Sequence, residues 1–284
     1  MSPSRSPNAG VLDSPQRVER FLREARAATN LAHLHIVSVY DAGRHAEQYF
    51  IASAFIERTT PAATIPDEGV PEIRRAVRLA RELAEALAYA HDQGVVHRDV
   101  KPANYLLDAK DRLHLADFGL AAKSDDSEAK LTNDGAVLRT PAYMSPEQVC
   151  GEKGEAKPAS DQYAAGVVLY ELLTRRTPFA GPPAVVIYNV LNTEPVRPTK
   201  LRPEIPADLE AICLKAMDKD PSRGYGSCGE LAADLAKWEE GLPVTARRVG
   251  QVGRTAKWAR RNPAMARLSA CIFLGPVDVG VVLV

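Results

Sequence analysis

One stretch of the chain is apolar on nearly every side when it is read as a helix. It runs from Tyr163 to Leu173 and follows Ser160, which we expect to cap the helix, and Asp161. A helix that is hydrophobic all round must be covered by other elements on all its faces. The 284 residues of the chain are enough for one sizeable core or two lobes. The stretch therefore predicts a central helix inside a larger helical body.

Other segments show helical or strand patterns that can surround this helix. Apolar spacing predicts further helices that start at Ser14-Pro15 and at Pro71, the second ended by Gly94. It predicts two more helices through Leu209–Met217 and through Leu231–Trp238, the last ended by Gly241. Short apolar or β-branched runs predict strands at residues 36–40, 49–52, 95–96, 105–107 and 113–115, with a turn at Gly43-Arg44. A small α/β piece followed by a mostly helical body predicts a two-lobed α+β fold.

One loop is dense in side chains that can carry chemistry. His97-Arg98-Asp99-Val100-Lys101-Pro102-Ala103-Asn104 brings together a carboxylate, an ammonium and an amide, and Asp117-Phe118-Gly119 follows further along the chain. Phosphoryl transfer needs a phosphate held, its charge neutralised and a hydroxyl aimed. Asp99 is the candidate base, and Lys101 is a point charge for the phosphate. Asn104 and Asp117 supply hard oxygen ligands of the kind that suit Mg²⁺.

These and later runs together resemble the protein kinase family. The loop at 97–104 and the turn at 117–119 are similar to its catalytic loop and metal-binding turn. Ser145-Pro146-Glu147 stands where the family has Ala-Pro-Glu, and Ser160-Asp161-Gln162-Tyr163 resembles the start of its buried central helix. Lys101 and Thr140 are similar to the serine/threonine branch, and the whole plan resembles bacterial Hanks-type, receptor-like kinases. The resemblance implies transfer of the ATP γ-phosphate to Ser or Thr of a protein substrate, with Mg²⁺ bound.

The resemblance also implies roles for residues around the loop. Asp161 is expected to hydrogen-bond the loop backbone, and Arg98 is expected to pair with a phosphate on the activation loop, for which Thr132 is the favoured site. Glu147 is expected to pair with an arginine. Gly224 stands at the position of that arginine, so the adjacent Arg223 is the candidate replacement.

The nucleotide side of the expected site has fewer matches. By the same resemblance, Ala54 and Ile56 offer backbone groups to adenine, and Leu106 forms its floor. Glu24 matches the partner of the family's ATP-binding lysine. No lysine precedes its helix, and we expect no glycine-rich phosphate loop in the chain. Three interpretations stay open, namely an active kinase, a catalytically inactive pseudokinase or scaffold, and a fragment of a longer active kinase.

Charge is spread unevenly along the chain. The 36 basic and 36 acidic residues cancel, so we expect no general attraction for nucleic acid. All charges between Leu242 and Val277 are basic, and an apolar run, residues 268–284, begins within this stretch and continues to the last residue. This resembles a basic flank before a membrane helix, although a full span needs about 20 apolar residues and Asp278 interrupts the run. A membrane anchor, a degraded or cut-off span and a docked tail stay open, and the basic flank could alternatively bind acidic lipid heads.

These observations give an expected domain order. We expect a lead at 1–13, a small lobe at 14–58 without the family's first strands, a helical lobe at 59–241, a basic juxtamembrane segment at 242–267 and the apolar tail at 268–284. The kinase portion is expected in the cytoplasm, anchored through the tail if the tail spans a membrane. The sequence indicates neither the protein substrate nor the oligomeric state.

Overall fold

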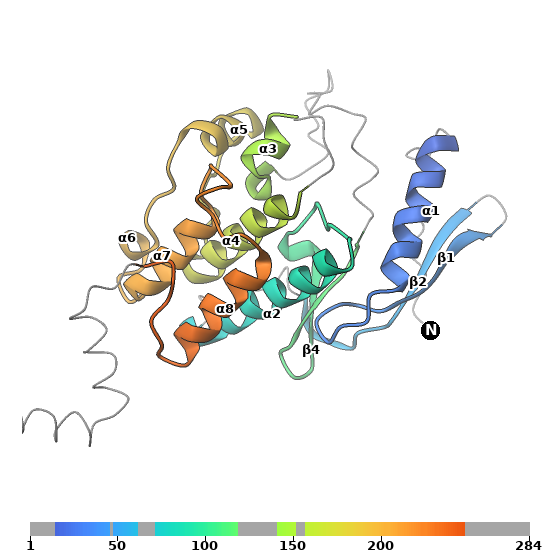
Figure 1. The fold of residues 1–284 in the computed structure, drawn as a ribbon, viewed down its shortest axis with the longest axis horizontal. Helices are drawn as coiled ribbons and strands as arrows, with labels where there is room; N and C mark the ends of the chain where they lie inside the picture. The colour runs from blue at the N-terminus through green and yellow to red at the C-terminus, as the bar shows by residue number, and fades with distance from the viewer. Residues whose placement is uncertain (1–14, 46–47, 62–71, 119–140, 152–156, 248–284) are drawn as a thin grey trace, which may run out of the picture.

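The structure is a computed structural model that describes residues 15–45, 48–61, 72–118, 141–151 and 157–247. Figure 1 shows a body of helices beside a smaller part made of one helix and a two-stranded sheet. This arrangement agrees with the predicted α+β fold, with a small α/β part ahead of a helical body. The predicted lead and the apolar tail lie outside the described residues.

The smaller part consists of helix α1 (Pro15–Thr29) and the antiparallel strands β1 (Val39–His45) and β2 (Gln48–Ser53). The first strand begins later than predicted. The Val37 N–H donates to the carbonyl of Leu115 at 2.8 Å, so this part of the chain pairs with residues near Leu115 and not with β2. The predicted turn at Gly43-Arg44 is wrong, since both residues lie within β1. Gly43 faces Phe50 across the pair, and a Cβ there would lie 3.3 Å from the Phe50 ring, so glycine makes room for the ring rather than for a turn.

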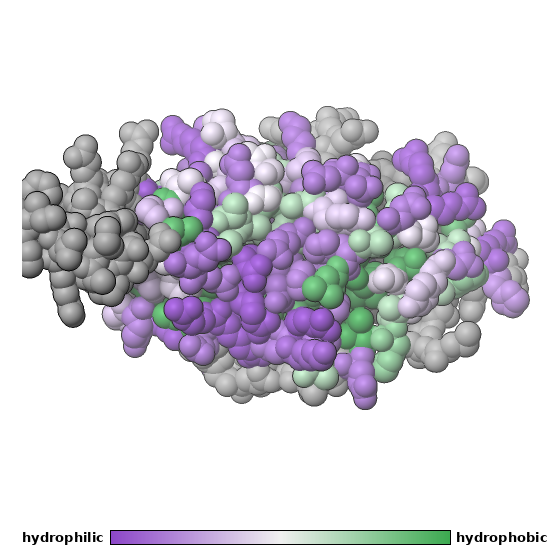
Figure 2. Space-filling view, turned by 60° about the horizontal axis from the view of Figure 1, so that its bottom comes forward, coloured by the Kyte–Doolittle hydropathy of each residue, from purple (hydrophilic) through white to green (hydrophobic). Residues whose placement is uncertain are grey.

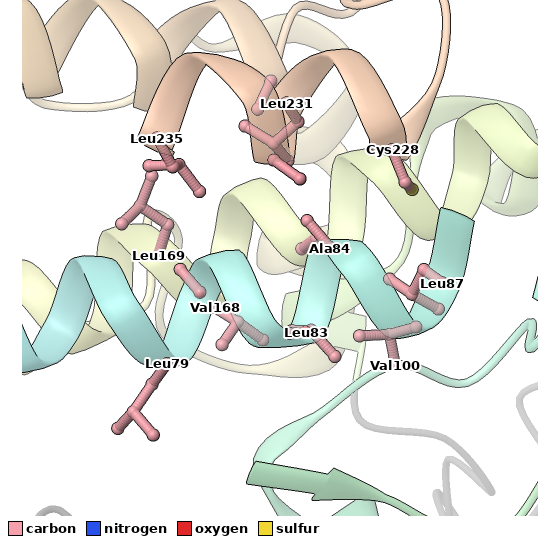
Figure 3. Close-up of a cluster of buried hydrophobic side chains, with 14 of the residues drawn as sticks. Leu79, Leu83, Ala84, Leu87, Val100, Val168, Leu169, Cys228, Leu231 and Leu235 are labelled. Atoms are coloured by element: carbon pink, nitrogen blue, oxygen red, sulfur yellow. The ribbon is translucent and has the colours of Figure 1, made fainter. Parts of the chain in front are cut away.

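The helical body is assembled around three long helices that pack against one another. They are α2 (Ile73–Asp92), α4 (Pro158–Thr174) and α8 (Cys228–Glu239). Figure 3 shows the apolar side chains that join them, with Leu83 and Leu87 on α2, Val168 on α4, and Leu231 on α8 among its labelled residues. The remaining helices are α3 (Pro146–Val149), α5 (Pro183–Asn192), α6 (Pro198–Leu201) and α7 (Ala207–Ala216). Burial of these side chains stabilises the body by roughly 1.5–3 kcal/mol for each large one.

Helix α4 is the central helix that the apolar stretch predicted. Every residue from Ser160 to Tyr170 is buried. Its start differs from the prediction, because Pro158 occupies the first turn and the helix begins two residues before Ser160. Proline fits that position because its missing N–H is not needed there. The Ser160 hydroxyl therefore does not cap the helix, and it donates instead to Glu147 Oε1 at 2.7 Å.

A small sheet joins the body to the loop at 97–104. It contains the antiparallel strands β3 (Arg58–Pro61), β4 (Tyr105–Asp108) and β5 (Leu113–Leu115). The loop lies between the end of α2 and β4, and its last residues form the 3₁₀ turn η2 (Pro102–Asn104). A second such turn, η4 (Pro141–Tyr143), precedes α3. Residues 95–96 are not a strand, so that prediction is wrong, while Gly94 ends α2 with a φ of 74°.

The helical body continues through Arg247. Val244 is 3% exposed and belongs to the main core. Asp234 accepts hydrogen bonds from the N–H groups of Thr245 and Ala246 at 2.8 and 2.9 Å. Residues 242–247, which we assigned to the basic segment, are thus packed on α8. Within the described ranges, no helix combines the length and apolar character needed to cross a bilayer.

The surface view shows a face that is mostly hydrophilic, with apolar side chains gathered toward the end that carries α1 and the β1–β2 sheet (Figure 2). Leu34, Tyr40 and Phe55 are the exposed large apolar residues of that part of the described chain.

Candidate active site

The backbone of the loop at 97–104 is anchored on the buried helix α4. The Asp161 carboxylate accepts hydrogen bonds from the N–H groups of His97 and Arg98, both at 2.7 Å. The predicted contact between Asp161 and this loop is therefore present. Asp161 is 1% exposed, so its charge needs such partners in order to remain buried.

The loop backbone is also bent in an unusual way. Arg98 has a φ of 71°, in the left-handed region that costs a non-glycine residue roughly 1–2 kcal/mol. The N–H on one side of Arg98 is held by Asp161, and the carbonyl on the other side accepts from Gln148 Nε2 at 3.0 Å. Strained backbone of this kind persists where its surroundings over-determine it.

Two candidate catalytic side chains, Lys101 and Asn104, converge on one oxygen of a third, Asp99. Asp99 Oδ2 lies 2.7 Å from Lys101 Nζ and accepts a hydrogen bond from Asn104 Nδ2 at 3.0 Å. Asn104 Nδ2 also donates to the Asp99 backbone carbonyl at 2.7 Å. The Asp99 and Lys101 side chains are 30% and 23% exposed, so the group is ordered and still open to solvent.

The turn at Asp117 is tied to the same loop. The Ala116 N–H donates to the Asn104 carbonyl at 2.8 Å, and the ring Nε2 of His97 donates to the Ala116 carbonyl at 2.9 Å. The His97 ring also meets Phe118 edge-on, with ring centres 4.7 Å apart. Asp117 itself has a φ of 64°. The structure thus places all four predicted catalytic residues on two segments that are bonded to each other.

The donor atoms suit a hard divalent cation. Because Asn104 Nδ2 is committed to Asp99, the amide oxygen of Asn104 is the atom left to bind an ion, and Asp117 provides a carboxylate. Across the described part of the chain, His, Cys, Asp and Glu side chains form no group of three that could hold a metal ion. An ion at Asn104 and Asp117 would therefore complete its shell with phosphate oxygens and water, as Mg²⁺ usually does.

Comparison with known proteins agrees with this geometry. Residues 10–228 match the family described as protein kinase domain. The chain belongs to the protein kinase family. It is 36% identical over 246 residues to serine/threonine-protein kinase PknB of Mycobacterium tuberculosis. The matched region covers 85% of this chain and 39% of PknB. It is 38% identical over 219 residues to serine/threonine-protein kinase PrkC of Bacillus subtilis. The matched region covers 77% of this chain and 33% of PrkC.

A third relative gives the same result. The probable serine/threonine-protein kinase SCO3848 of Streptomyces coelicolor is 37% identical over 246 residues, which cover 84% of this chain and 36% of the relative. The chain thus spans between a third and two fifths of the length of these relatives. The predicted membership in the bacterial serine/threonine kinases and the predicted fold class are confirmed.

The predicted adenine contacts lie beside the β1–β2 sheet and on β4. Ala54 follows β2, and its N–H donates to the Ser38 carbonyl at 2.8 Å, so the carbonyl is the backbone group that Ala54 could offer. Ile56 is half-buried two residues later. Leu106 is half-buried on β4, opposite His114 of β5. Their contacts with a nucleotide stay a prediction.

Glu147 has a partner other than the predicted arginine. It accepts from the Ser160 hydroxyl, whereas Arg223 is 74% exposed and lies 3.6 Å from Asp220. The proposed replacement by Arg223 is therefore wrong. The short, uncharged Ser160 reaches Glu147 because Pro158 starts α4 early and places Ser160 on its first turn.

Several predicted residues cannot be placed as sites. Thr132 and Thr140 lie outside the described residues. Glu24 lies on α1, and its side chain is also outside the described part. Their regulatory roles stay predictions.

A Gly-x-Gly-x-x-Gly run, the pattern of the phosphate loop that we expected to be absent, does occur at Gly224–Gly229. It opens α8 in the helical body rather than following a strand beside the loop. The amides there are already bonded, because Glu230 N–H donates to Ser227 Oγ at 3.2 Å and Gly226 N–H donates to Glu230 Oε2 at 3.0 Å. The Glu230 carboxylate also opposes a phosphate at this position, so the run is a helix start and not a phosphate loop.

Two residues near the site were missed by sequence reasoning. His91 on α2 donates from Nε2 to Asp161 Oδ2 at 2.8 Å, and Gln148 on α3 contacts the Arg98 carbonyl. His91 occupies an apolar stripe of an amphipathic helix, and Gln148 follows Glu147 with no pattern of its own. The sequence offered no signal for either contact.

Proposed function

We propose that this chain transfers the γ-phosphate of ATP to serine or threonine hydroxyls of proteins, with Mg²⁺ as the metal ion. The convergence of Lys101 and Asn104 on Asp99 Oδ2, at 2.7 and 3.0 Å, is the observation that carries the proposal.

The geometry supports a division of roles. Both contacts fall on Asp99 Oδ2, so Oδ1 is the oxygen that would accept the hydroxyl proton as the new O–P bond forms. The bond from the γ-phosphorus to the bridging oxygen of ADP breaks in the same transfer. Lys101 would then stabilise charge on the moving phosphoryl group. Bound Mg²⁺ would neutralise phosphate charge, held by the Asn104 oxygen and the Asp117 carboxylate.

The test measures labelled phosphate transferred from ATP in the presence of Mg²⁺. The purified chain is incubated with itself and with a mixture of Ser- and Thr-containing peptides. We expect incorporation on Ser or Thr that falls by about 10²–10⁴-fold in Asp99→Asn, because that variant cannot take the proton. Asp92→Asn, at the exposed end of α2, is the matched control and should retain incorporation.

Two outcomes would contradict the proposal. If the unaltered chain folds and incorporates no label, the pseudokinase or the fragment interpretation replaces it. If Asp99→Asn incorporates as much label as the unaltered chain, Asp99 is not the base. Calorimetry with ATP and Mg²⁺ separates a chain that binds nucleotide without turnover from one that binds none.

We also propose that the segment after Arg247 brings the kinase to a membrane surface. The support is its run of basic residues, which attract anionic lipid heads, followed by the apolar residues 268–284. In flotation with vesicles that contain anionic lipid, the full chain should float, and removal of 268–284 should return it to the soluble fraction. If the full chain stays in the soluble fraction, this proposal is wrong.

A further inference from the structure

The segment Pro141–Val149 lies against the catalytic loop and is attached to the body at several points. Ala142 and Val149 pack on the apolar cluster that contains Val186 and Val190 of α5. The Tyr143 hydroxyl donates to Glu171 on α4 at 2.7 Å. These contacts fix the segment to the helical body, and none of them reaches the loop at 97–104.

Gln148 provides a direct bond from this segment to the loop. Its Nε2 donates to the Arg98 carbonyl at 3.0 Å. That carbonyl belongs to the peptide unit that joins Arg98 to Asp99, and the N–H at the other end of the unit donates to His97 Nδ1 at 3.3 Å. The orientation of the peptide unit immediately before the candidate base is therefore set by Gln148 on one side and by His97 on the other.

The other end of the same amide is used inside α3. Gln148 Oε1 accepts from the Ser145 N–H at 3.0 Å, while the Ser145 hydroxyl accepts from the Gln148 N–H at 3.4 Å. This reciprocal pair is a capping box, and glutamate serves in it as well as glutamine. A glutamate cannot donate to a carbonyl, so only the amide satisfies the cap and the loop together.

We propose that Gln148 is a positioning residue that couples the segment 141–149 to the peptide unit before Asp99. The coupling follows from the two ends of the Gln148 amide, which bond Ser145 and the Arg98 carbonyl. Its consequence for catalysis rests on the proposed kinase activity. A displacement of the 141–149 segment would then be felt at Asp99 through a single hydrogen bond.

Three variants separate the helix cap at Ser145 from the hydrogen bond to the Arg98 carbonyl. Gln148→Glu keeps the shape and the capping acceptor, but places a carboxylate oxygen against the Arg98 carbonyl. Ser145→Ala does the reverse, since it removes the capping hydroxyl and leaves the amide-to-Arg98 bond in place. Gln148→Met removes the donor without adding a charge, and so separates the lost bond from charge repulsion.

The test is amide hydrogen exchange of the full chain, followed by mass spectrometry of peptides from the loop and from residues 141–151. Gln148→Glu and Gln148→Met should raise exchange in the loop by about three- to tenfold, the size expected for one lost hydrogen bond. Ser145→Ala should raise exchange in the 141–151 peptide and leave the loop unchanged. Where phosphotransfer is measurable, Gln148→Glu should lower kcat by a similar factor with the KM for ATP unchanged.

Three results would overturn the coupling. They are unchanged loop exchange in Gln148→Glu, unchanged loop exchange in Gln148→Met, and an equal rise in Ser145→Ala, which would indicate simple loosening of α3. An unaltered chain without phosphotransfer would contradict the proposed function alone, because the exchange experiment needs no activity.

Discussion

The Nε2 atom of His91 lies 2.8 Å from Oδ2 of Asp161, and the two side chains are almost fully buried, at 8% and 1% exposed. Asp161 in turn holds the backbone of the loop at 97–104 through His97 and Arg98. The end of α2, the start of α4 and the loop therefore meet at one carboxylate. Asp161 is satisfied only when all three elements are in place.

This contact predicts the effect of changing His91. His91→Leu should lower the free energy of unfolding by about 1–3 kcal/mol, because a buried carboxylate loses a hydrogen-bond donor. His91→Gln, which can still present an N–H to Asp161, should recover at least half of that loss. Urea unfolding at neutral pH measures both variants. Equal stability of the two would show that the loss arises from packing and not from the hydrogen bond.

The sequence predicted the parts of the site that short motifs define. Asp99, Lys101, Asn104 and Asp117 fall within two short runs, so their chemistry and proximity could be read locally. Asp161 was predicted through the family resemblance, and the apolar pattern after it correctly indicated a buried helix. The start of that helix was mistaken because Ser160 is a good cap residue and Pro158 is a stronger start signal for this helix.

Contacts between distant segments could not be predicted from the sequence. His91 and Asp161 are 70 positions apart, and Gln148 and Arg98 are 50 apart. Each contact depends on how helices pack, and packing leaves no local signature on a single polar residue. Gly43 shows the same limit, since glycine indicates a turn by default and the neighbouring Phe50 ring is visible only in the folded sheet.

The Asn104 amide has a donor role and a proposed ligand role, which can be separated. Asn104→Asp keeps an oxygen for the metal ion, but faces the Asp99 carboxylate and carbonyl with another acceptor. We expect its kcat to fall by about 10- to 100-fold through lost positioning, with little change in the Mg²⁺ concentration for half-maximal rate. Asn104→Ala should also raise that concentration. Rates across a Mg²⁺ titration test this, and full activity in Asn104→Asp would contradict the donor role.

Glu171 gives the protein a pH-dependent stability. Burial raises the pKa of its carboxyl above the ordinary value of 4.5, partly opposed by the hydrogen bond from Tyr143. The protonated form is thus favoured in the folded state, so the stability it provides is complete below about pH 4.5 and is lost as pH rises through the raised pKa. A tenfold difference in the proton affinity of this carboxyl between the folded and unfolded chain is equivalent to about 1.4 kcal/mol.

The corresponding experiment compares unfolding free energies between pH 4.5 and pH 7. Glu171→Gln should gain stability relative to the unaltered chain as pH rises, because it carries no charge to bury. Tyr143→Phe should show a steeper loss with rising pH than the unaltered chain, since it removes the donor that favours the ionised form. Parallel curves for all three proteins would show that Glu171 is not the titrating group.

The contact between α4 and α7 is close enough that it depends on a glycine. A Cβ added at Gly166 would lie 2.8 Å from the Cβ of Ala216 and 2.9 Å from Met217 Cγ. Gly166→Ala should therefore destabilise the protein by about 1–3 kcal/mol through overpacking, despite the helix propensity of alanine. At Gly229 on α8 an added Cβ meets its nearest atoms at 3.5 and 3.8 Å, which is ordinary contact. Gly229→Ala should be neutral or should stabilise by about 0.4–1 kcal/mol. Thermal unfolding of the two variants distinguishes a steric cost at one packed interface from a general effect of replacing glycine in a helix. If Gly166→Ala is as stable as Gly229→Ala, the close approach of α4 and α7 is contradicted.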